Sequence, residues 1–388
     1  MMHRQIYHIS LLTAFAVAAL LSSACSADDN SGLSNNPADD RQPVAFSATM
    51  ADSQEAETRA VPNVMDVAGL KLATGGFGVF ACYTGLHRYG DVDAQPDFMY
   101  NQKVAWTAGA WKYTPLKYWP NGEGEVDGST GDVPHHVSFM AYAPYSDMST
   151  GNAGYCIPSM SYQHEVGNPW ITYRLHTDPA NQVDLLYATP LLNKTKQSTA
   201  GALSFEFQHA LACVGNEVTV TASDAMKTYL NTQREGDGSG EVSRVELVLK
   251  TFSITYTLTE KGRLVLWSAD GKPHWETINS ESGLVTRTVN YTVPADKVLY
   301  SYNGSSTGGA DYTDNDHGVF YIPIHMANHY QTAVATLTYE IRTYESDDSP
   351  LGTTSSGAKV SAPVVLSDYP TAYQPGKNLS LTFRVKND

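Results

Sequence analysis

The chain has 388 residues, of which 42% are hydrophobic and 17% charged, a length typical of one or two globular domains. Its formal net charge is −15, from 40 acidic and 25 basic residues. Phosphate binding needs a basic surface, so nucleic acid and anionic lipid are excluded as main partners. Four cysteines are too few for a disulfide scaffold, and no C-x-x-C pair indicates a zinc ribbon.

The N-terminus has the pattern of an export signal. A short start with Arg4 precedes an almost wholly apolar run, Ile9–Leu21, and small residues follow up to Cys25. This pattern predicts a secretory signal peptide. Ser-Ser-Ala-Cys also looks like a bacterial lipobox, although Leu21 lies one residue too far from Cys25. We predict a lipoprotein signal peptide over residues 1–24 and lipidation of Cys25, which anchors a chain to a membrane. The alternative is an ordinary secretory signal with an unmodified cysteine.

A polar tether and one isolated strand follow the signal. Residues 26–42 are mostly polar or small and cannot bury enough surface to order themselves. In Pro43–Met50 apolar residues alternate with small or polar ones, which predicts a strand with one buried face. The inward residues of that strand are Val44, Phe46, Ala48 and Met50. A second polar stretch leads to Arg59, and exposed polar loops are where proteases cut.

Beyond Arg59 the chain is predicted to be all-β. Short apolar or alternating runs recur between clusters of Asn, Gly, Asp and Pro, with a hairpin predicted at Asp270-Gly271 and one short helix over Ser223–Asn231. Long helical periodicity is absent, and strands at this spacing indicate β-sandwiches. The length is enough for two, which we place at 60–198 and 199–388 with the boundary in the polar stretch Asn193–Ala200. The predicted runs are Phe77–Tyr83, Val104–Ala105, Trp111–Tyr113, Val137–Ala143, Leu185–Ala188, Ala202–Phe207, Ala212–Ala222, Val242–Leu258, Arg263–Trp267, Trp275–Ile278, Leu284–Val293, Val319–Ile324, Ala333–Tyr344 and Leu379–Val385.

A group of large aromatic residues in the first half admits two interpretations. Such side chains bury a large area in a core and pair their polar tips at its rim. They could also form a stacking platform for a sugar, and the core is the favoured interpretation. The residues are Trp111, Tyr113, Tyr118, Trp119, Phe139 and Tyr142. His209, after Phe205 and Phe207, is interpreted as a hydrogen-bonded histidine beside the core rather than a ligand.

Catalytic and metal-binding patterns are weak. Gly304–Gly308 matches the nucleophile-elbow pattern, but no helix follows it, so we interpret it as a loop. His325 and His329 lack the Glu of a zinc-protease motif. Three acidic residues before Gly318 lack the spacing of a calcium loop. We therefore predict no enzyme, no metal site and no cofactor. The acidic residues are Asp311, Asp314 and Asp316, and the cysteines after Cys25, for which pairing and free thiols both stay open, are Cys82, Cys156 and Cys213.

Several short motifs occur in a recognisable order along the chain. They are Trp111–Pro120, Val137–Pro144, Asp184–Ala188, Phe205–Leu211, Tyr321–Pro323 and Pro375–Lys377. Each is weak alone, but their succession resembles the fimbrillin family, the type V pilins and related surface lipoproteins of anaerobic Gram-negative bacteria. The likeness runs from the lipobox to the C-terminus and so covers essentially the whole chain.

The resemblance implies two tandem transthyretin-like, Greek-key β-sandwiches and a lipoprotein precursor matured by an Arg-specific protease. It places the cut between Arg59 and Ala60, which makes residues 25–59 a propeptide and its strand removable. Arg41 is the nearest alternative cleavage site, but a cut there would leave the strand attached to the body. Assembly would follow by exchange of a strand between subunits.

The C-terminal strand is the candidate donor for that exchange. Within residues 377–386, apolar side chains alternate with polar ones at the period of the removable strand. The competing interpretation makes it the last strand of its own sandwich, in a tip subunit that accepts a strand but donates none. The apolar residues are Leu379, Leu381, Phe383 and Val385.

Two functions follow as hypotheses. The first is a structural pilus subunit, stalk or tip, that serves adhesion from a fimbrium at the outer membrane and cell surface. Its expected partners are other pilin subunits in a homo- or heteropolymer, an Arg-specific protease, the membrane through lipid on Cys25 before maturation, and a host or bacterial surface ligand. The alternative is a monomeric outer-membrane lipoprotein that binds glycan.

Overall fold

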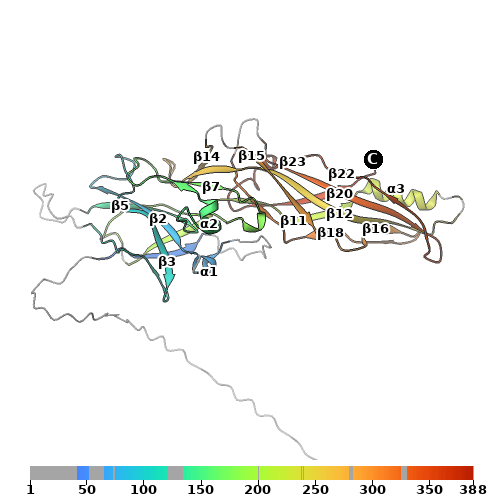
Figure 1. Ribbon diagram of the computed structural model, residues 1–388, viewed down its shortest axis with the longest axis horizontal. Coiled ribbons are helices and arrows are strands. Elements are labelled where there is room, and N and C mark those ends of the chain that lie inside the picture. Colours follow the sequence, from blue (N-terminus) through green and yellow to red (C-terminus); the bar gives the residue numbers. More distant parts are fainter. Residues whose placement is uncertain are drawn as a thin grey trace, which may run out of the picture. The chain divides into compact units, whose positions relative to one another are not determined.

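Alternating apolar residues build an all-β fold in the part of the chain that the structure describes, as the sequence predicts. The computed structural model describes residues 42–51, 65–72, 75–120, 134–199, 201–236, 238, 240–278, 283–324 and 330–387 (Figure 1). Cys25, Arg59 and Ala60 lie outside these residues, as do His325 and His329. Residues Arg41–Asp388 form one compact unit.

The first sheet has eight strands and contains the strand predicted upstream of Arg59. Its order is β1-β10-β8-β5-β2-β3-β4, and β9 pairs with β5. The strands are β1 (Phe46–Met50), β2 (Phe77–Gly85), β3 (Met99–Thr107), β4 (Ala110–Lys112), β5 (His136–Ala143), β8 (Leu186–Ala188), β9 (Leu191–Lys194) and β10 (Leu203–His209).

The central strands β2 and β5 are buried on both faces, which explains why their sequences are continuous apolar runs. On one face Phe77 and Phe139 belong to a core that also includes Phe46 of β1. On the other face Phe80 and Met140 belong to a second, larger core. Strand β1 therefore contributes to the first of these cores and not to the second.

A four-stranded sheet contributes to that second core. Its order is β14-β13-β7-β6, and it joins segments from the two halves of the sequence. The hairpin predicted at Asp270-Gly271 connects β13 and β14, with Gly271 at a φ of 80° that favours glycine. The strands are β6 (Ser159–Met160), β7 (Trp170–Arg174), β13 (Lys261–Val265) and β14 (His274–Glu276), and the short helices α1 (Val67–Leu70) and α2 (Gly151–Cys156) lie in the same half as β6 and β7.

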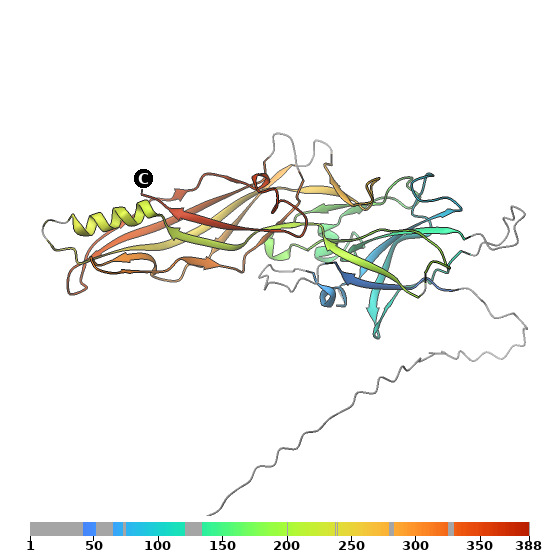
Figure 2. The ribbon, with the colours of Figure 1, turned by 180° about the vertical axis from the view of Figure 1, so that it is seen from behind.

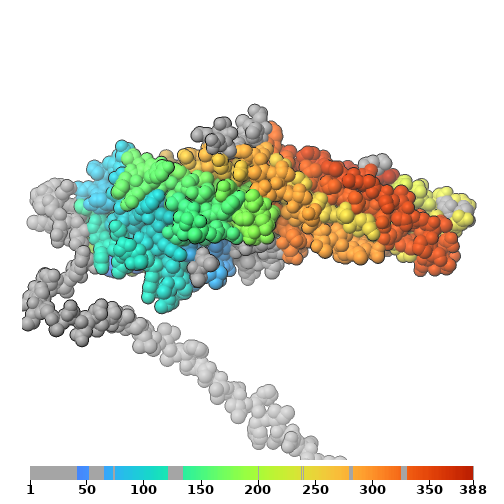
Figure 3. Space-filling view, in the orientation of Figure 1, coloured from blue at the N-terminus to red at the C-terminus, as the bar shows by residue number. Residues whose placement is uncertain are grey.

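The C-terminal half has two further sheets, which share the larger core. The first has the order β18-β11-β19 with β24 on β11, and the second has the order β17-β16-β12-β20-β21 with β15, β22 and β23 at its sides. The first comprises β11 (Ala212–Ala222), β18 (Tyr312–Asp314), β19 (Val319–Tyr321) and β24 (Asn378–Val385). The second comprises β12 (Arg244–Thr259), β15 (Leu284–Tyr291), β16 (Lys297–Tyr302), β17 (Thr307–Gly308), β20 (Thr332–Tyr344), β21 (Pro350–Ser355), β22 (Lys359–Val360) and β23 (Val364–Val365). The orange and red segments of this half cover much of the face in Figure 3.

The predicted helix is present and is longer than expected. Helix α3 spans Asp224–Glu235, and the Ser223 side chain accepts a hydrogen bond from the Met226 amide as its N-cap. Met226 and Leu230, four residues apart, face the core. The backbone N–H of Ser223 also donates to the Val385 carbonyl at 2.9 Å, which ties the start of the helix to the end of β24.

The sheets do not divide between residues 198 and 199. Strand β10 follows that point yet pairs with β1 and β8, and hairpin β13–β14 pairs with β7. Strand pairing therefore crosses the predicted domain boundary, because the pairing partners of β10 and β13 are distant in sequence. The division into two domains stays a prediction.

The cysteines, the Gly304–Gly308 segment and the acidic residues before Gly318 lie in the following surroundings. Cys82, Cys156 and Cys213 are buried and form no disulfide with one another, and burial raises the pKa of Cys82 to about 12. Residues 303–306 form a turn between β16 and β17, with the Asn303 side chain accepting from the amides of Ser305 and Ser306. Asp314 accepts from the Asp316 amide. Within the described ranges, no cluster of three potential metal ligands is present, and no helix is long and apolar enough to span a membrane.

Candidate strand-exchange site

Strand β1 is an edge strand of the first sheet. It runs parallel to β10, with Phe46 opposite Leu203 and Met50 opposite Phe207. The Leu203 amide donates to the Ala45 carbonyl at 2.8 Å, and the Ala51 amide donates to the Phe207 carbonyl at 2.9 Å. Both ends of β1 are thus fixed to β10, and in Figure 2 the two strands lie side by side. The edge of β10 is a row of backbone groups that needs a strand partner.

A second segment holds the residues that precede β1. The Val44 amide donates to the Lys117 carbonyl at 2.9 Å, and the Trp119 amide donates to the Gln42 carbonyl at 3.0 Å. The Tyr113 hydroxyl donates to the Val44 carbonyl at 2.7 Å. The strand and its approach therefore lie in a groove between β10 and residues 113–119, which we call the β1 groove.

Phe46 is the most extensively packed side chain of β1, at 5% exposure. Its ring stacks on Phe205 with centroids 5.5 Å apart. The rings of Tyr113, Phe139 and Phe77 surround it with centroids at 5.4, 5.9 and 6.4 Å. We call this set of four rings the Phe46 slot. Aromatic contacts at these separations stabilise beyond the area that they bury.

The other predicted inward residues of β1 lie on the same side. Val44 is buried at 1% exposure, and Ala48 and Met50 are half-buried against the same core. The face predicted from the alternation is therefore the buried face. Ser47 is half-buried and Thr49 is exposed.

The core interpretation of the large aromatic residues is confirmed. Trp119, Phe139 and Tyr142 are buried, and Trp111 and Tyr113 are half-buried against the core that holds Phe46. Tyr142 faces the larger core. Tyr118 is half-buried and forms a bridge with Pro43. Several of these residues line the β1 groove, a role that composition and spacing do not indicate.

A buried carboxylate holds Met65, the first residue after Arg59 that the structure describes. Asp184 is fully buried, and its Oδ2 lies 2.7 Å from His209 Nδ1 and accepts from the Met65 amide at 3.0 Å. His209 ends β10, so one side chain connects the start of the body to the strand beside β1. His209 is hydrogen-bonded beside the core, as predicted. Sequence analysis did not assign Asp184 this role, because its partners are distant along the chain.

The C-terminal strand lies in a sheet of its own chain. Strand β24 runs parallel to β11, from Asn378 opposite Cys213 to Val385 opposite Ala222 (Figure 2). Its four alternating apolar residues, Leu379, Leu381, Phe383 and Val385, are buried at 8%, 5%, 7% and 4% exposure. The predicted strand and its buried face are present, and in this conformation the apolar face packs in the chain's own core.

Comparison with known proteins identifies similar fimbrial proteins. The all-β fold is similar to the crystal structure of a fimbrial protein from Bacteroides vulgatus, with a TM-score of 0.57 and 19% identity, over 88% of this chain and 95% of that one. The sequence is 25% identical over 313 residues to the fimbrium subunit Fim1C of Phocaeicola vulgatus, which covers 75% of this chain and 74% of that protein. No protein-family model matches the chain. The resemblance to the fimbrillin family is confirmed by these relatives.

The Phe46 slot generates a stability prediction. Phe46→Ala in the uncut chain should lower the free energy of unfolding by about 3–5 kcal/mol, because it removes a large side chain from a closely packed site. Equilibrium urea denaturation measures this change. Ser47→Ala, on the other face of the strand, is the matched control and should stay within about 0.5 kcal/mol of the original chain. An equal effect of the two substitutions would contradict the packing described for Phe46.

The Tyr113 hydroxyl generates a second prediction. Tyr113→Phe keeps the ring in the Phe46 slot but leaves the Val44 carbonyl without this donor, so we expect a loss of about 0.5–1.5 kcal/mol. The same substitution should increase amide hydrogen exchange in residues 42–51 more than elsewhere, because the bond acts on that segment. Tyr162→Phe, at a 75% exposed tyrosine, is the control. Exchange that rises uniformly over the chain would argue against a local role.

Proposed function

We propose that the chain is a structural subunit of a surface fimbria that serves adhesion, matured by an Arg-specific cut and assembled by strand exchange. The observation that carries the proposal is β1: an edge strand with a buried aromatic anchor, whose covalent link to the rest of the body runs through the residues that include Arg59. A fimbrial role is supported by the sequence relative that is named a fimbrium subunit. A structural role without catalysis and a location at the cell surface accord with the same relatives.

Cleavage after Arg59 would change how β1 is held. A strand joined by a short flexible linker has an effective concentration of about millimolar at its groove. Once the linker is cut, the strand is retained by the hydrogen bonds to β10 and residues 113–119, by the burial of Val44 and Phe46, and by the partial burial of Ala48 and Met50. Its departure would open an apolar groove beside unpaired backbone groups, which is the kind of site that accepts an added strand.

The incoming strand should match the pattern that β1 leaves. It needs an apolar residue at every second position and a large one for the Phe46 slot. The C-terminal strand meets both conditions, since Phe383 lies among alternating apolar residues. A contact between the groove of one subunit and the C-terminal strand of the next is heterologous, and such contacts generate open filaments. Donation requires β24 to leave β11, so a tip subunit that only accepts a strand is the competing proposal.

The predicted signal peptide and lipidation of Cys25 complete the proposal. They would deliver the precursor to the outer membrane and anchor it there through its tether. The cut after Arg59 would then release the body from the lipid and free the β1 groove in one event. Removal of the anchor and activation for assembly are therefore coupled by the position of Arg59, which lies after both Cys25 and β1.

Cleavage is tested by one substitution. Arg59→Ala should leave a lipid-anchored precursor and abolish polymers, because a trypsin-like specificity pocket needs the cation and β1 stays covalently attached. Cell-surface protein is measured by N-terminal sequencing and by the ladder of polymers on gels run without boiling. Arg41→Ala is the matched control, an arginine before rather than after β1, and it should have no effect. Unchanged processing of the Arg59 variant would refute the proposed cut.

Donation by β24 is tested by a reversible lock. Thr221 and Arg384 are paired across β11 and β24, so Thr221→Cys with Arg384→Cys should form a disulfide that keeps β24 in its own sheet. If the strand donates, the oxidised variant forms no polymers and the reduced variant forms them. Polymers that form equally in both redox states would mean that β24 does not donate. The two single-cysteine variants control for the substitutions themselves.

A further inference from the structure

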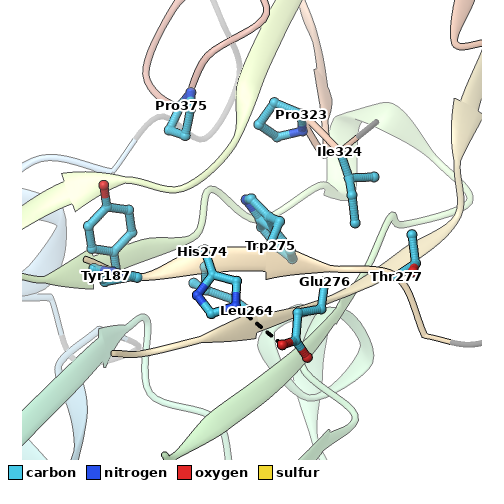
Figure 4. Close-up of a pocket in the computed structure, with 10 residues that line it drawn as sticks. Tyr187, Leu264, His274, Trp275, Glu276, Thr277, Pro323, Ile324 and Pro375 are labelled. Atoms are coloured by element: carbon cyan, nitrogen blue, oxygen red, sulfur yellow. Dashed lines mark hydrogen bonds and ion pairs between the residues drawn. The ribbon is translucent and has the colours of Figure 1, made fainter. Parts of the chain in front are cut away.

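A groove of about 410 Å³ runs along strand β24, and neither β1 nor residues 113–119 line it. Its walls come from β20, β22 and β23 on one side and from β24 on the other (Figure 1). A larger hollow of about 720 Å³ lies beside β14, but there the side chains of His274 and Glu276 bond to each other (Figure 4). We call the first of these the β24 groove, and it opens where the edges of the two C-terminal sheets face each other.

The edge of β24 at this groove has no strand partner among the described residues, since β24 pairs with β11 alone. The Lys377 carbonyl accepts from the Cys213 amide at 2.9 Å. The Val385 carbonyl accepts from the Ser223 amide, also at 2.9 Å. Backbone groups of successive residues in a strand point to opposite edges, so the N–H and C=O groups of Thr382 point away from β11. An edge of this kind accepts an added strand.

The floor of the β24 groove is apolar. Leu337 of β20 and Phe383 of β24 are each 7% exposed, and Val385 is 4% exposed. These side chains belong to the larger core, so the groove is a gap at the margin of that core. A strand added to β24 would place every second side chain over this floor. Apolar side chains at those positions would remove further apolar surface from water.

The charged residues that line the groove are cations. They are Lys359, Arg384 and Lys386, and no carboxylate stands among the lining residues of the described chain, although the whole chain has a net charge of −15. Arg384 is exposed and follows the buried Phe383, so it lies on the outer face of β24. Lys359 is paired with Leu337 and so lies on the core side of β22. This charge favours an acidic partner and opposes pairing with the same edge of a second copy.

We propose that the β24 groove binds an extended protein segment in which apolar and acidic side chains alternate, added as a strand to the free edge of β24. The alternation matches both faces of the site. Apolar side chains on one face of the added strand would cover Leu337 and Phe383, and carboxylates on its other face would lie beside Arg384. Backbone bonds to Thr382 would supply affinity, and the charges would supply the choice of partner.

The binding itself requires neither cleavage after Arg59 nor departure of β24. Its consequence for assembly rests on the proposed function, because a segment bound to β24 would stabilise that strand on β11 and oppose its donation to another subunit. Failure of the binding and failure of strand exchange are separate results, since the binding is measured on the uncut chain with both strands in place.

The test is a fluorescence-anisotropy titration of the uncut, full chain carrying Cys25→Ala, which removes the predicted site of lipidation. The probe is a dye-labelled peptide of four Glu-Val repeats. We expect saturable binding with a Kd of about 10–100 µM, and a peptide of four Lys-Val repeats should bind at least about tenfold more weakly. Binding should also weaken as salt is raised from about 0.02 to 0.5 M, because the paired charges are exposed.

Substitutions locate the bound peptide. Arg384→Glu with Lys386→Glu should raise the Kd about tenfold, since each charge reversal removes an exposed ion pair and adds a repulsion. Thr382→Pro should abolish binding, because it removes an N–H on the free edge and none that bonds to β11. Thr382→Ala keeps that N–H and should bind normally. Lys112→Glu with Lys272→Glu, at exposed lysines outside the groove, is the control for net charge and should leave the Kd unchanged.

Three results would overturn the proposal. They are the absence of saturable binding by the Glu-Val peptide, equal binding of the Glu-Val and Lys-Val peptides, and binding that survives both Thr382→Pro and the double reversal. If Thr382→Pro does not fold, the double reversal at two exposed side chains decides alone. Sedimentation velocity tests a second copy of the chain as the occupant, and a dimer that Thr382→Pro abolishes and the Glu-Val peptide does not dissociate would equally overturn the proposal.

Discussion

The burial of Phe46 among four aromatic rings is the interaction on which the organisation of the first sheet depends. It anchors a strand that would otherwise have only a single row of backbone bonds to β10, and it closes a core that Phe77, Phe139 and Phe205 also share. Without that side chain, the edge of β10 and the aromatic rings beneath it would face solvent together, an arrangement that favours pairing with another strand. The same contact thus stabilises the uncut chain and defines what a replacement strand must supply.

Strands whose signal is local were predictable from the sequence. Strand β11 coincides with its predicted run, and β24 and β12 deviate only at their ends, because alternation of buried and exposed residues is a property of consecutive positions. Strands β21 to β23 were missed because their residues are exposed or only half-buried, which leaves no apolar period to detect. Strands β7 and β16 are not among the predicted runs, although both contain aromatic and β-branched residues that favour strands.

The candidate site was only partly predictable, for a different reason. The residues of β1 and their buried face follow from the sequence, but their partners do not. Tyr113 bonds to a carbonyl 69 positions away, and Asp184 bonds to an amide 119 positions away. Pairing across such separations depends on which strands become neighbours, and the alternation within a strand carries no information on its neighbour. The strand pairing that crosses residue 198 has the same cause, since β10 is close in sequence to β11 but pairs with β1.

The two strands of the proposed exchange are held to different extents, and this difference would set the order in which they leave their sheets. Strand β1 has five residues in register with β10 and one buried apolar side chain, Phe46, and Val44 just before the strand is also buried. Strand β24 has seven residues in register with β11 and four buried apolar side chains. Since stabilisation grows with the apolar area removed from water, β1 should be the weaker of the two once its linker is cut. A β24 strand that moved to a neighbour's β1 groove would give up four buried side chains on β11. The exchange can therefore be favourable only if the groove buries as much of β24 as β11 does, and the Phe46 slot, which already surrounds a phenylalanine ring, would have to receive Phe383.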